Sequence, residues 1–166
     1  MQKLLGLFLA FIFLTGCGYL PASKQARKVV GDRLFVEVIV SLEDPQNAVL
    51  IKDAARKAVV TRFHASLVPK VQSRTQLLVE LSSITFSALQ YDTNGYVSVY
   101  RANIYLNVNR ITDGDSKSYK ALGNYDFNIE ANAVITDSQR FDAIREASLK
   151  ALDSFIAQVG AEGSRL

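Results

Sequence analysis

The chain has 166 residues and a formal net charge of +3, with 19 Lys and Arg against 16 Asp and Glu. This near balance, without a basic helix or an RNA-binding aromatic signature, argues against a dedicated nucleic-acid binder. A single Cys and a single His exclude a disulfide and a Cys/His metal site, and a Ser-His-Asp or Cys-His enzyme would depend on His64 alone. Composition therefore favours a non-catalytic protein without a metal or cofactor.

The first 16 residues have the pattern of a secretory signal peptide. Lys3 precedes an apolar run at residues 4–14, which is shorter than the roughly 20 residues of a membrane-spanning helix. The ending Leu14-Thr15-Gly16-Cys17 is similar to the lipobox of bacterial lipoproteins, in which the cysteine is lipidated and becomes the mature N-terminus. We therefore expect residues 1–16 to be removed and Cys17 to be triacylated, with palmitate as one of its chains.

Residues 17–32 are interpreted as the lipidated N-terminus and a tether. They hold Pro21 and no acidic residue before Asp32, and their basic residues are Lys24, Arg27 and Lys28. A solvated tether is the simpler explanation of these charges, and the alternative is attraction to anionic head groups beside the anchor. Gly18 is not Asp, the residue that resembles an inner-membrane retention signal, so we expect an anchor on the periplasmic side of the outer membrane.

The next two elements are a strand and a helix. Residues 34–40 (LFVEVIV) are β-branched and almost continuously apolar, which predicts a strand covered on most of one face. Asp44 and Pro45 predict a helix start, because Asp caps helices and Pro fits the first turn. Apolar residues at helical spacing continue to Phe63. His64 lies near the end of this helix, where we expect an exposed or capping residue.

Three meandering strands are predicted next, over residues 76–91, 96–110 and 118–134. In the first, the apolar positions change face at Ser82-Ser83, which predicts a β-bulge or a strong bend. Asn94-Gly95 is a strong hairpin-turn signal, and residues 112–115 form a second turn. Both later strands alternate between an apolar face and a polar face, which predicts that one side of the sheet is buried.

The two alternating faces also predict a register for the last two strands. If Arg110 lies opposite Lys117, large residues meet small ones on the apolar face, as close packing prefers. A side chain larger than that of Gly123 would then clash with the strand opposite. The predicted pairs are Leu106–Ala121, Ile104–Gly123, Ala102–Tyr125, Arg101–Asp126 and Asn103–Asn124.

A capping box at Thr136 and Gln139 and an apolar stripe up to Val159 predict a last helix that ends at Gly160, before a flexible tail at residues 161–166. The order β-α-β-β-β-α within residues 33–160 predicts a single α+β domain. We expect a two-layer sandwich, with a four-stranded, mostly antiparallel sheet and two helices on one face. The other face is left uncovered and is rich in Asn, a poor strand former. It is either simply solvated or hydrogen-bonded to a polar partner, such as the lumen of a β-barrel or a sugar.

The order of these features resembles the LptE family of lipopolysaccharide-assembly lipoproteins. The resemblance is carried by Cys17-Gly18-Tyr19, Asp44-Pro45, the hairpin around Asn94-Gly95-Tyr96, the Tyr100-Arg101 pair and the closing amphipathic helix. It implies a two-layer fold, a place in the outer membrane and no catalysis. It also implies a role as the plug of the β-barrel LptD, which delivers lipopolysaccharide to the cell surface.

The resemblance suggests a use for the uncovered face. Basic side chains near strand ends could pair with lipopolysaccharide phosphates, and the candidates are Arg101, Lys117 and Lys120. The candidates for facing the barrel are Asn103, Tyr105, Asn107, Asn124 and Asn128. Two alternatives stay open, an auxiliary lipoprotein of an envelope lipid-transport ABC system and an envelope hydrolase that depends on His64.

Overall fold

The computed structural model describes residues 22–39, 45–130 and 132–165. Helix α2 (Ala22–Val30) leads into strand β1 (Arg33–Ile39) and helix α3 (Pro45–Thr61). A short strand β2 (Ser66–Leu67) and a 3-10 helix η1 (Lys70–Gln72) follow. Three long strands, β3 (Thr75–Tyr91), β4 (Val97–Thr112) and β5 (Asp115–Asn128), precede helix α4 (Asp137–Gly163).

The five strands form one mixed sheet in the order β2-β1-β3-β4-β5. β1 runs parallel to β2 and β3, whereas β3, β4 and β5 are antiparallel. β1 and β3 can pair in parallel because parallel neighbours need a crossover connection, and the segment that contains α3 provides it. The predicted α+β fold is thus confirmed, but the sheet has five strands and the described residues form three α-helices, where four strands and two helices were expected. The sheet is also mixed and not mostly antiparallel, because two of its four strand pairings are parallel.

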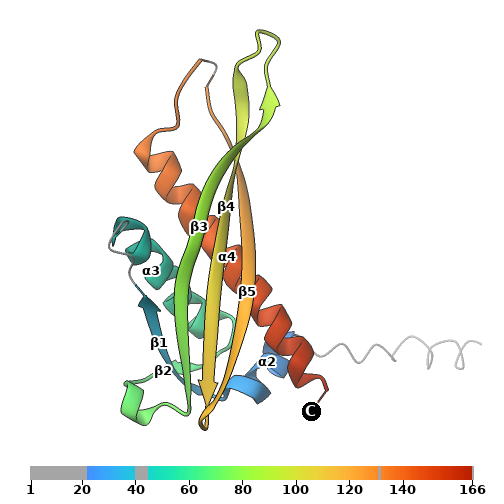
Figure 1. Ribbon diagram of the computed structural model, residues 1–166. Coiled ribbons are helices and arrows are strands. Elements are labelled where there is room, and N and C mark those ends of the chain that lie inside the picture. The colour runs from blue at the N-terminus through green and yellow to red at the C-terminus, as the bar shows by residue number, and fades with distance from the viewer. Residues whose placement is uncertain (1–21, 40–44, 131, 166) are drawn as a thin grey trace, which may run out of the picture.

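All three helices lie on the same side of the sheet and leave the other side open (Figure 1). The core fills the space between the two layers. Ile104 and Leu106 of β4 are almost completely buried, as are Ile144 and Phe155 of α4. This arrangement is the predicted two-layer sandwich with an uncovered sheet face.

The predicted register of the last two strands is confirmed. Arg110 lies opposite Lys117, and all five predicted pairs are present. Gly123 lies opposite Ile104 on the apolar face, as the register predicts. A slip by one residue would turn that face away from the helices.

The predicted bulge is also present, as a register shift between Leu81 and Ser83 in the pairing of β3 with β4. The extra residue returns Ile84 to the side of the sheet that holds Val79, because side chains otherwise alternate strictly along a strand. A strand of 17 residues can therefore keep its apolar side toward the helices on both sides of the bulge.

Part of the predicted tether is a packed helix. Helix α2 buries Ala26, Val29 and Val30, whose spacing is that of one helical face. The helix lies against the end of α4, where a side-chain carbon on Gly160 would come within 2.7 Å of the Ala22 carbonyl oxygen. The tether interpretation of residues 22–30 is therefore corrected, and residues 17–21, with Cys17 among them, lie outside the described residues.

Helix α4 begins as predicted and ends later than predicted. Thr136 and Gln139 form the capping box. The helix does not stop at Gly160 but continues to Gly163, so that Glu162 belongs to the helix and not to a flexible tail. Gly160 has a packing role, because the absence of a side chain allows α2 to approach.

Candidate interaction face

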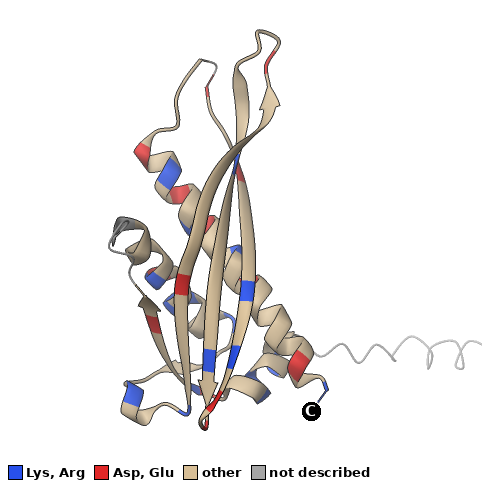
Figure 2. Cartoon of the chain, viewed as in Figure 1, with Lys and Arg blue, Asp and Glu red and all other residues tan. Residues whose placement is uncertain are grey.

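The open face is the side of the sheet that the helices leave uncovered. Strand pairing aligns its outward side chains in rows across the sheet, and Figure 2 shows that charges are sparse along the middle of the strands. The rows are Glu37–Leu78–Asn109–Ser118, Ile39–Glu80–Asn107–Lys120, Ser83–Tyr105–Leu122, Thr85–Asn103–Asn124 and Ser87–Arg101–Asp126.

Asn side chains give this face its hydrogen-bonding character. Asn103 donates from Nδ2 to Ser87 Oγ at 3.3 Å and to Thr85 Oγ1 at 3.4 Å. Ser116 donates to Asn109 Oδ1 at 2.8 Å. Because the side chains alternate along each strand, all of the residues predicted to face a barrel point out from this face. These residues are Asn103, Tyr105, Asn107, Asn124 and Asn128.

Arg101 lies on the open face but is already paired. Its guanidinium donates to the Asp126 carboxylate at 2.6 Å from Nε and at 2.7 Å from Nη2. Hydrogen bonds from Arg101 lower the pKa of Asp126, so the pair stays ionised over a wide pH range. A phosphate would have to compete with this carboxylate for Arg101.

Lys117 does not lie on the open face. It lies two residues before Tyr119 in β5 and therefore on the same side of the sheet, which the helices cover, and its Nζ donates to Glu162 Oε2 at 2.7 Å. Of the three predicted phosphate-binding residues, the structure therefore brings Arg101 and Lys120 to the open face and turns Lys117 away from it.

Lys120 lies between two shallow grooves on the open face. One groove, of about 480 Å³, is lined by Ile39, Leu78 and Glu80, among others. The second, of about 450 Å³, is lined by Tyr105 and Leu122, among others, and Lys120 borders both grooves. Within the part of the chain that the structure describes, its ammonium group forms no ion pair.

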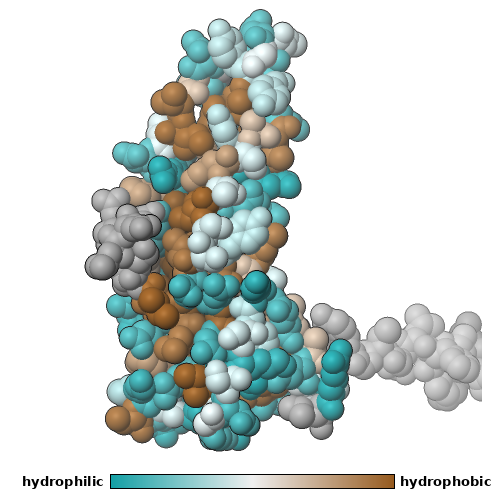
Figure 3. Space-filling view, in the orientation of Figure 1, coloured by the Kyte–Doolittle hydropathy of each residue, from teal (hydrophilic) through white to brown (hydrophobic). Residues whose placement is uncertain are grey.

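Apolar side chains border these grooves. Ile39 is 48% exposed, Leu122 44% and Tyr105 41%, although large apolar residues usually favour the core. Figure 3 shows hydrophobic patches on this face between hydrophilic ones. The sequence analysis missed Leu122, although an apolar residue at an outward position of an alternating strand was a usable signal.

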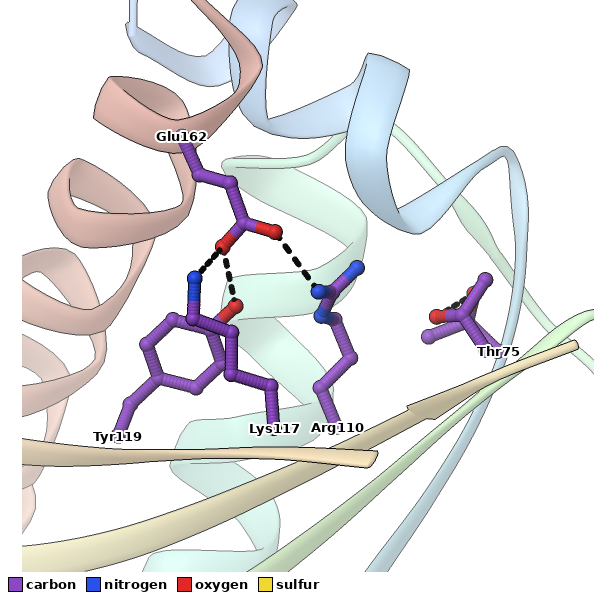
Figure 4. A network of polar contacts seen from close by, with 6 residues as sticks. Thr75, Arg110, Lys117, Tyr119 and Glu162 are labelled. Carbon is purple, nitrogen blue, oxygen red and sulfur yellow. Dashed lines mark hydrogen bonds and ion pairs between the residues drawn. The ribbon is translucent and has the colours of Figure 1, made fainter. Parts of the chain in front are cut away.

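A second polar cluster ties the end of α4 to the β4–β5 hairpin (Figure 4). In this Glu162 cluster, the Glu162 carboxylate accepts from Arg110 at 2.8 Å, from Lys117 at 2.7 Å and from the Tyr119 hydroxyl at 2.7 Å. Burial alone would raise the pKa of Glu162, but hydrogen bonds from Lys117 and Tyr119 and the charge of Arg110 outweigh it and lower that pKa. Burial and the hydrogen bond to Glu162 raise the pKa of Tyr119 to about 12. The cluster joins the end of α4 to β4 and β5 through one carboxylate and two cations, so it keeps a net positive charge.

The described residues also bear on metal binding and on membrane-spanning helices. In residues 22–39, 45–130 and 132–165, no three or more His, Cys, Asp and Glu side chains are grouped to hold a metal ion. None of the helices in these same ranges has the length and apolarity needed to span a membrane. His64 lies just beyond α3 and is exposed, with a φ of 51°.

Comparisons with known proteins give a family and a fold. The family model of LptE, described as lipopolysaccharide-assembly, matches residues 35–159. Rare lipoprotein B from Shewanella oneidensis has a similar structure, with 17% identity, a TM-score of 0.51 and coverage of 80% of this chain and 96% of that one. A lipoprotein from Caulobacter crescentus, 6% identical, has a TM-score of 0.55 with coverage of 87% and 96%. No curated protein sequence matches the chain.

Proposed function

The chain belongs to the LptE family of lipopolysaccharide-assembly proteins, and from this we propose that it is a lipid-anchored, non-catalytic partner of an LptD-type β-barrel in the outer membrane. In this role it plugs the barrel and supports the export of lipopolysaccharide to the cell surface. Cys17 carries the anchor. Its acylation makes the attachment stable, because two or more acyl chains are enough to hold a protein on a membrane.

The open face is the observation that carries this proposal. A protein that lies inside a water-filled barrel needs an apolar core and an exterior that can form hydrogen bonds. The open face offers Asn, Ser and Thr side chains in rows, with Tyr105 exposed among them. Tyr is enriched at protein interfaces because it combines a large apolar ring with a polar hydroxyl. Asn103, Tyr105, Asn107, Asn124 and Asn128 are therefore the proposed contacts to the barrel.

Lys120 is the proposed contact to lipopolysaccharide. A phosphate of this lipid needs a cation, and its acyl chains need apolar surface. Lys120 combines an ammonium group without an ion pair among the described residues with apolar groove borders at Ile39 and Leu122. Arg101 and Lys117 are already engaged by carboxylates, so we give them secondary roles at most.

The partnership is tested by affinity purification of the tagged protein from detergent-solubilised envelopes, followed by mass spectrometry. We expect a large outer-membrane β-barrel in near-stoichiometric amount. Recovery of inner-membrane transporter components would instead favour the auxiliary lipoprotein of a lipid-transport ABC system. The matched variants Asn103→Asp and Asn124→Asp, which add charge to the open face, should lower the yield of the barrel.

Lipid binding is tested with purified lipopolysaccharide and the Lys120→Ala variant. Loss of one charge-assisted hydrogen bond is expected to weaken binding by roughly tenfold or more. Lys52→Ala is the control, because Lys52 is an exposed lysine on α3, far from the open face. Equal affinity of the Lys120 variant and the wild type would remove Lys120 from the binding site.

A further inference from the structure

Positive charge collects at one end of the molecule, which we call the basic end. It comprises α2, the starts of β1 and β3, η1, the β4–β5 turn and the end of α4 (Figures 1 and 2). Contacts between distant segments hold it together. Arg33 donates to Gln72 Oε1 at 3.2 Å, and Arg74 pairs with Asp113 at 2.9 Å.

The charge count at the basic end is strongly asymmetric. It has nine basic residues and four acidic ones, whereas the rest of residues 17–166 has nine basic and twelve acidic. The small net charge of the whole chain conceals this separation. The acidic residues at this end are Asp32, Asp113, Asp115 and Glu162, and its basic residues are Lys24, Arg27, Lys28, Arg33, Lys70, Arg74, Arg110, Lys117 and Arg165.

Helix α2 presents the least compensated part of this charge. Lys24, Arg27 and Lys28 share its exposed side, at the spacing of one helical face, and α2 contains no acidic residue. Its opposite side is buried against α4, which fixes the direction in which the three cations point. None of the three forms an ion pair with another described residue.

The distance from the anchor limits where this surface can lie. Only five peptide steps separate Cys17 from Ala22, which is at most about 18 Å of chain. With Cys17 lipidated, α2 cannot move far from the membrane. The membrane surface is a large anionic partner that such a short connection holds next to these charges.

We propose that the basic end docks on anionic phospholipid head groups of the leaflet that holds the anchor, with Lys24, Arg27 and Lys28 as the main contacts. This inference rests on the proposed lipidation of Cys17. Docking orients the domain, with the β4–β5 turn toward the membrane and the hairpin turn at Asn94-Gly95 away from it. Each basic residue near such a surface contributes about fivefold, so three favour the docked orientation by roughly a hundredfold.

The test uses the mature lipoprotein, purified from membranes and reconstituted into vesicles. Lipidation removes the only thiol, so that a new cysteine can be labelled with a fluorescent donor. Val71→Cys places the donor at the basic end, and Val134→Cys places it in the β5–α4 connection. Both native side chains are exposed, Val71 at 93% and Val134 at 82%. Energy transfer to an acceptor lipid is compared in phosphatidylcholine vesicles and in equal mixtures of phosphatidylcholine and phosphatidylglycerol.

Matched charge variants measure the contribution of the α2 charges separately from that of net charge. Lys24→Gln, Arg27→Gln and Lys28→Gln are combined in one protein. The control combines Lys52→Gln, Arg56→Gln and Lys57→Gln, which remove the same charge from exposed positions on α3. We expect phosphatidylglycerol to increase transfer from position 71 and not from position 134. The α2 variant should lose this increase, high salt should weaken it, and the α3 variant should keep it.

The failures of the two proposals are distinguishable. A wild-type protein whose Cys17 reacts with the label and which does not float with phosphatidylcholine vesicles would refute the lipid anchor itself. A protein that floats with both vesicles but shows the same transfer in each would refute docking alone. A stronger response to lipopolysaccharide vesicles than to phosphatidylglycerol vesicles of equal charge density would assign the surface to the glycolipid and overturn the proposal.

Discussion

Gly123 of β5 lies directly against the backbone of Ala151 in α4. A side-chain carbon on Gly123 would come 2.9 Å from the Ala151 Cα, and it would come still closer to the Ala147 carbonyl oxygen. The sequence predicted that a larger side chain at position 123 would clash with the strand opposite. The pairing with Ile104 is confirmed. The clash, however, would be with helix α4, because the backbone of α4 packs directly against the backbone of β5 at Gly123.

Gly123→Ala should therefore destabilise the protein by about 1–3 kcal/mol, because the added methyl group cannot enter without moving α4. Urea unfolding of the purified protein measures the change. Asn124→Ala, on the open face of the same strand, is the control and should change stability by less than about 0.5 kcal/mol. A Gly123→Ala protein as stable as the wild type would contradict the close contact.

Gly163→Ala should loosen α2 without disturbing the sheet. A side-chain carbon on Gly163 would meet the carbonyl group of Gln25, 2.9 Å from its carbon. Hydrogen exchange is the appropriate measurement, and the amides of α2 should exchange faster while those of β4 are unchanged. Ala161→Ser, at an exposed position of the same helix, should leave α2 protected.

Glu162→Gln should lower the free energy of unfolding by about 1–3 kcal/mol, because it removes the charge that three donors share. Arg110 is affected most, since its side chain is only 12% exposed. Thermal unfolding measures the loss. Asp115→Asn, in the adjacent hairpin turn, provides the control, and an equal loss in that variant would show that the effect is one of net charge.

Stability at high pH should depend on Tyr119. Because its pKa is raised to about 12, the folded protein holds this proton more tightly than the unfolded chain does. The resulting stabilisation is complete below the ordinary tyrosine pKa of about 10 and is lost as the pH rises toward 12. Unfolding free energies measured across this range for the wild type and Tyr119→Phe should diverge. Parallel pH profiles would contradict the assignment.

Cys17→Ala should leave the signal peptide uncleaved or the protein mislocalised. The reason is chemical, since alanine has no thiol to which a lipid can be attached. Fractionation of inner and outer membranes, with an antibody against the protein, measures the outcome. A Cys17→Ala protein that is cleaved and reaches the outer membrane normally would refute the lipoprotein assignment.

The sheet was largely predictable because side chains along a strand point to the same face at every second residue. Ile104 opposite Gly123 and Arg101 opposite Asp126 both follow from matching two alternating sequences. The change of face at Ser82-Ser83 likewise required a bulge. The pattern of β2 was too short to detect, because two residues carry no period.

The helices that lie near the chain ends were harder to predict. The three basic residues of α2 looked like those of a solvated tether, although Ala26, Val29 and Val30 have helical spacing. Gly160 resembled a helix stop, since glycine commonly ends helices. In both cases the deciding factor is the contact between α2 and α4, which joins residues more than 130 positions apart.

At the candidate site, too, features that follow from local periodicity were predictable, and contacts between distant segments were not. Outward Asn residues follow from strand alternation, so the open face was predictable. Lys117 was proposed as a phosphate-binding residue because it lies near a strand end. Alternation already places it on the same side of β5 as Tyr119, but nothing in the local sequence indicates its partner Glu162, which lies 45 residues further along the chain.

The close contacts at Gly160 and Gly163 also define a mechanical path. With Cys17 lipidated as proposed, a pull on the anchor would reach the described domain at α2 and pass at these contacts into α4, a single helix of 27 residues and about 40 Å. That helix lies along β5 and begins at the opposite end of the sheet (Figure 1). Such a pull would therefore be distributed along α4 and the strands on which it packs, instead of ending in one loop.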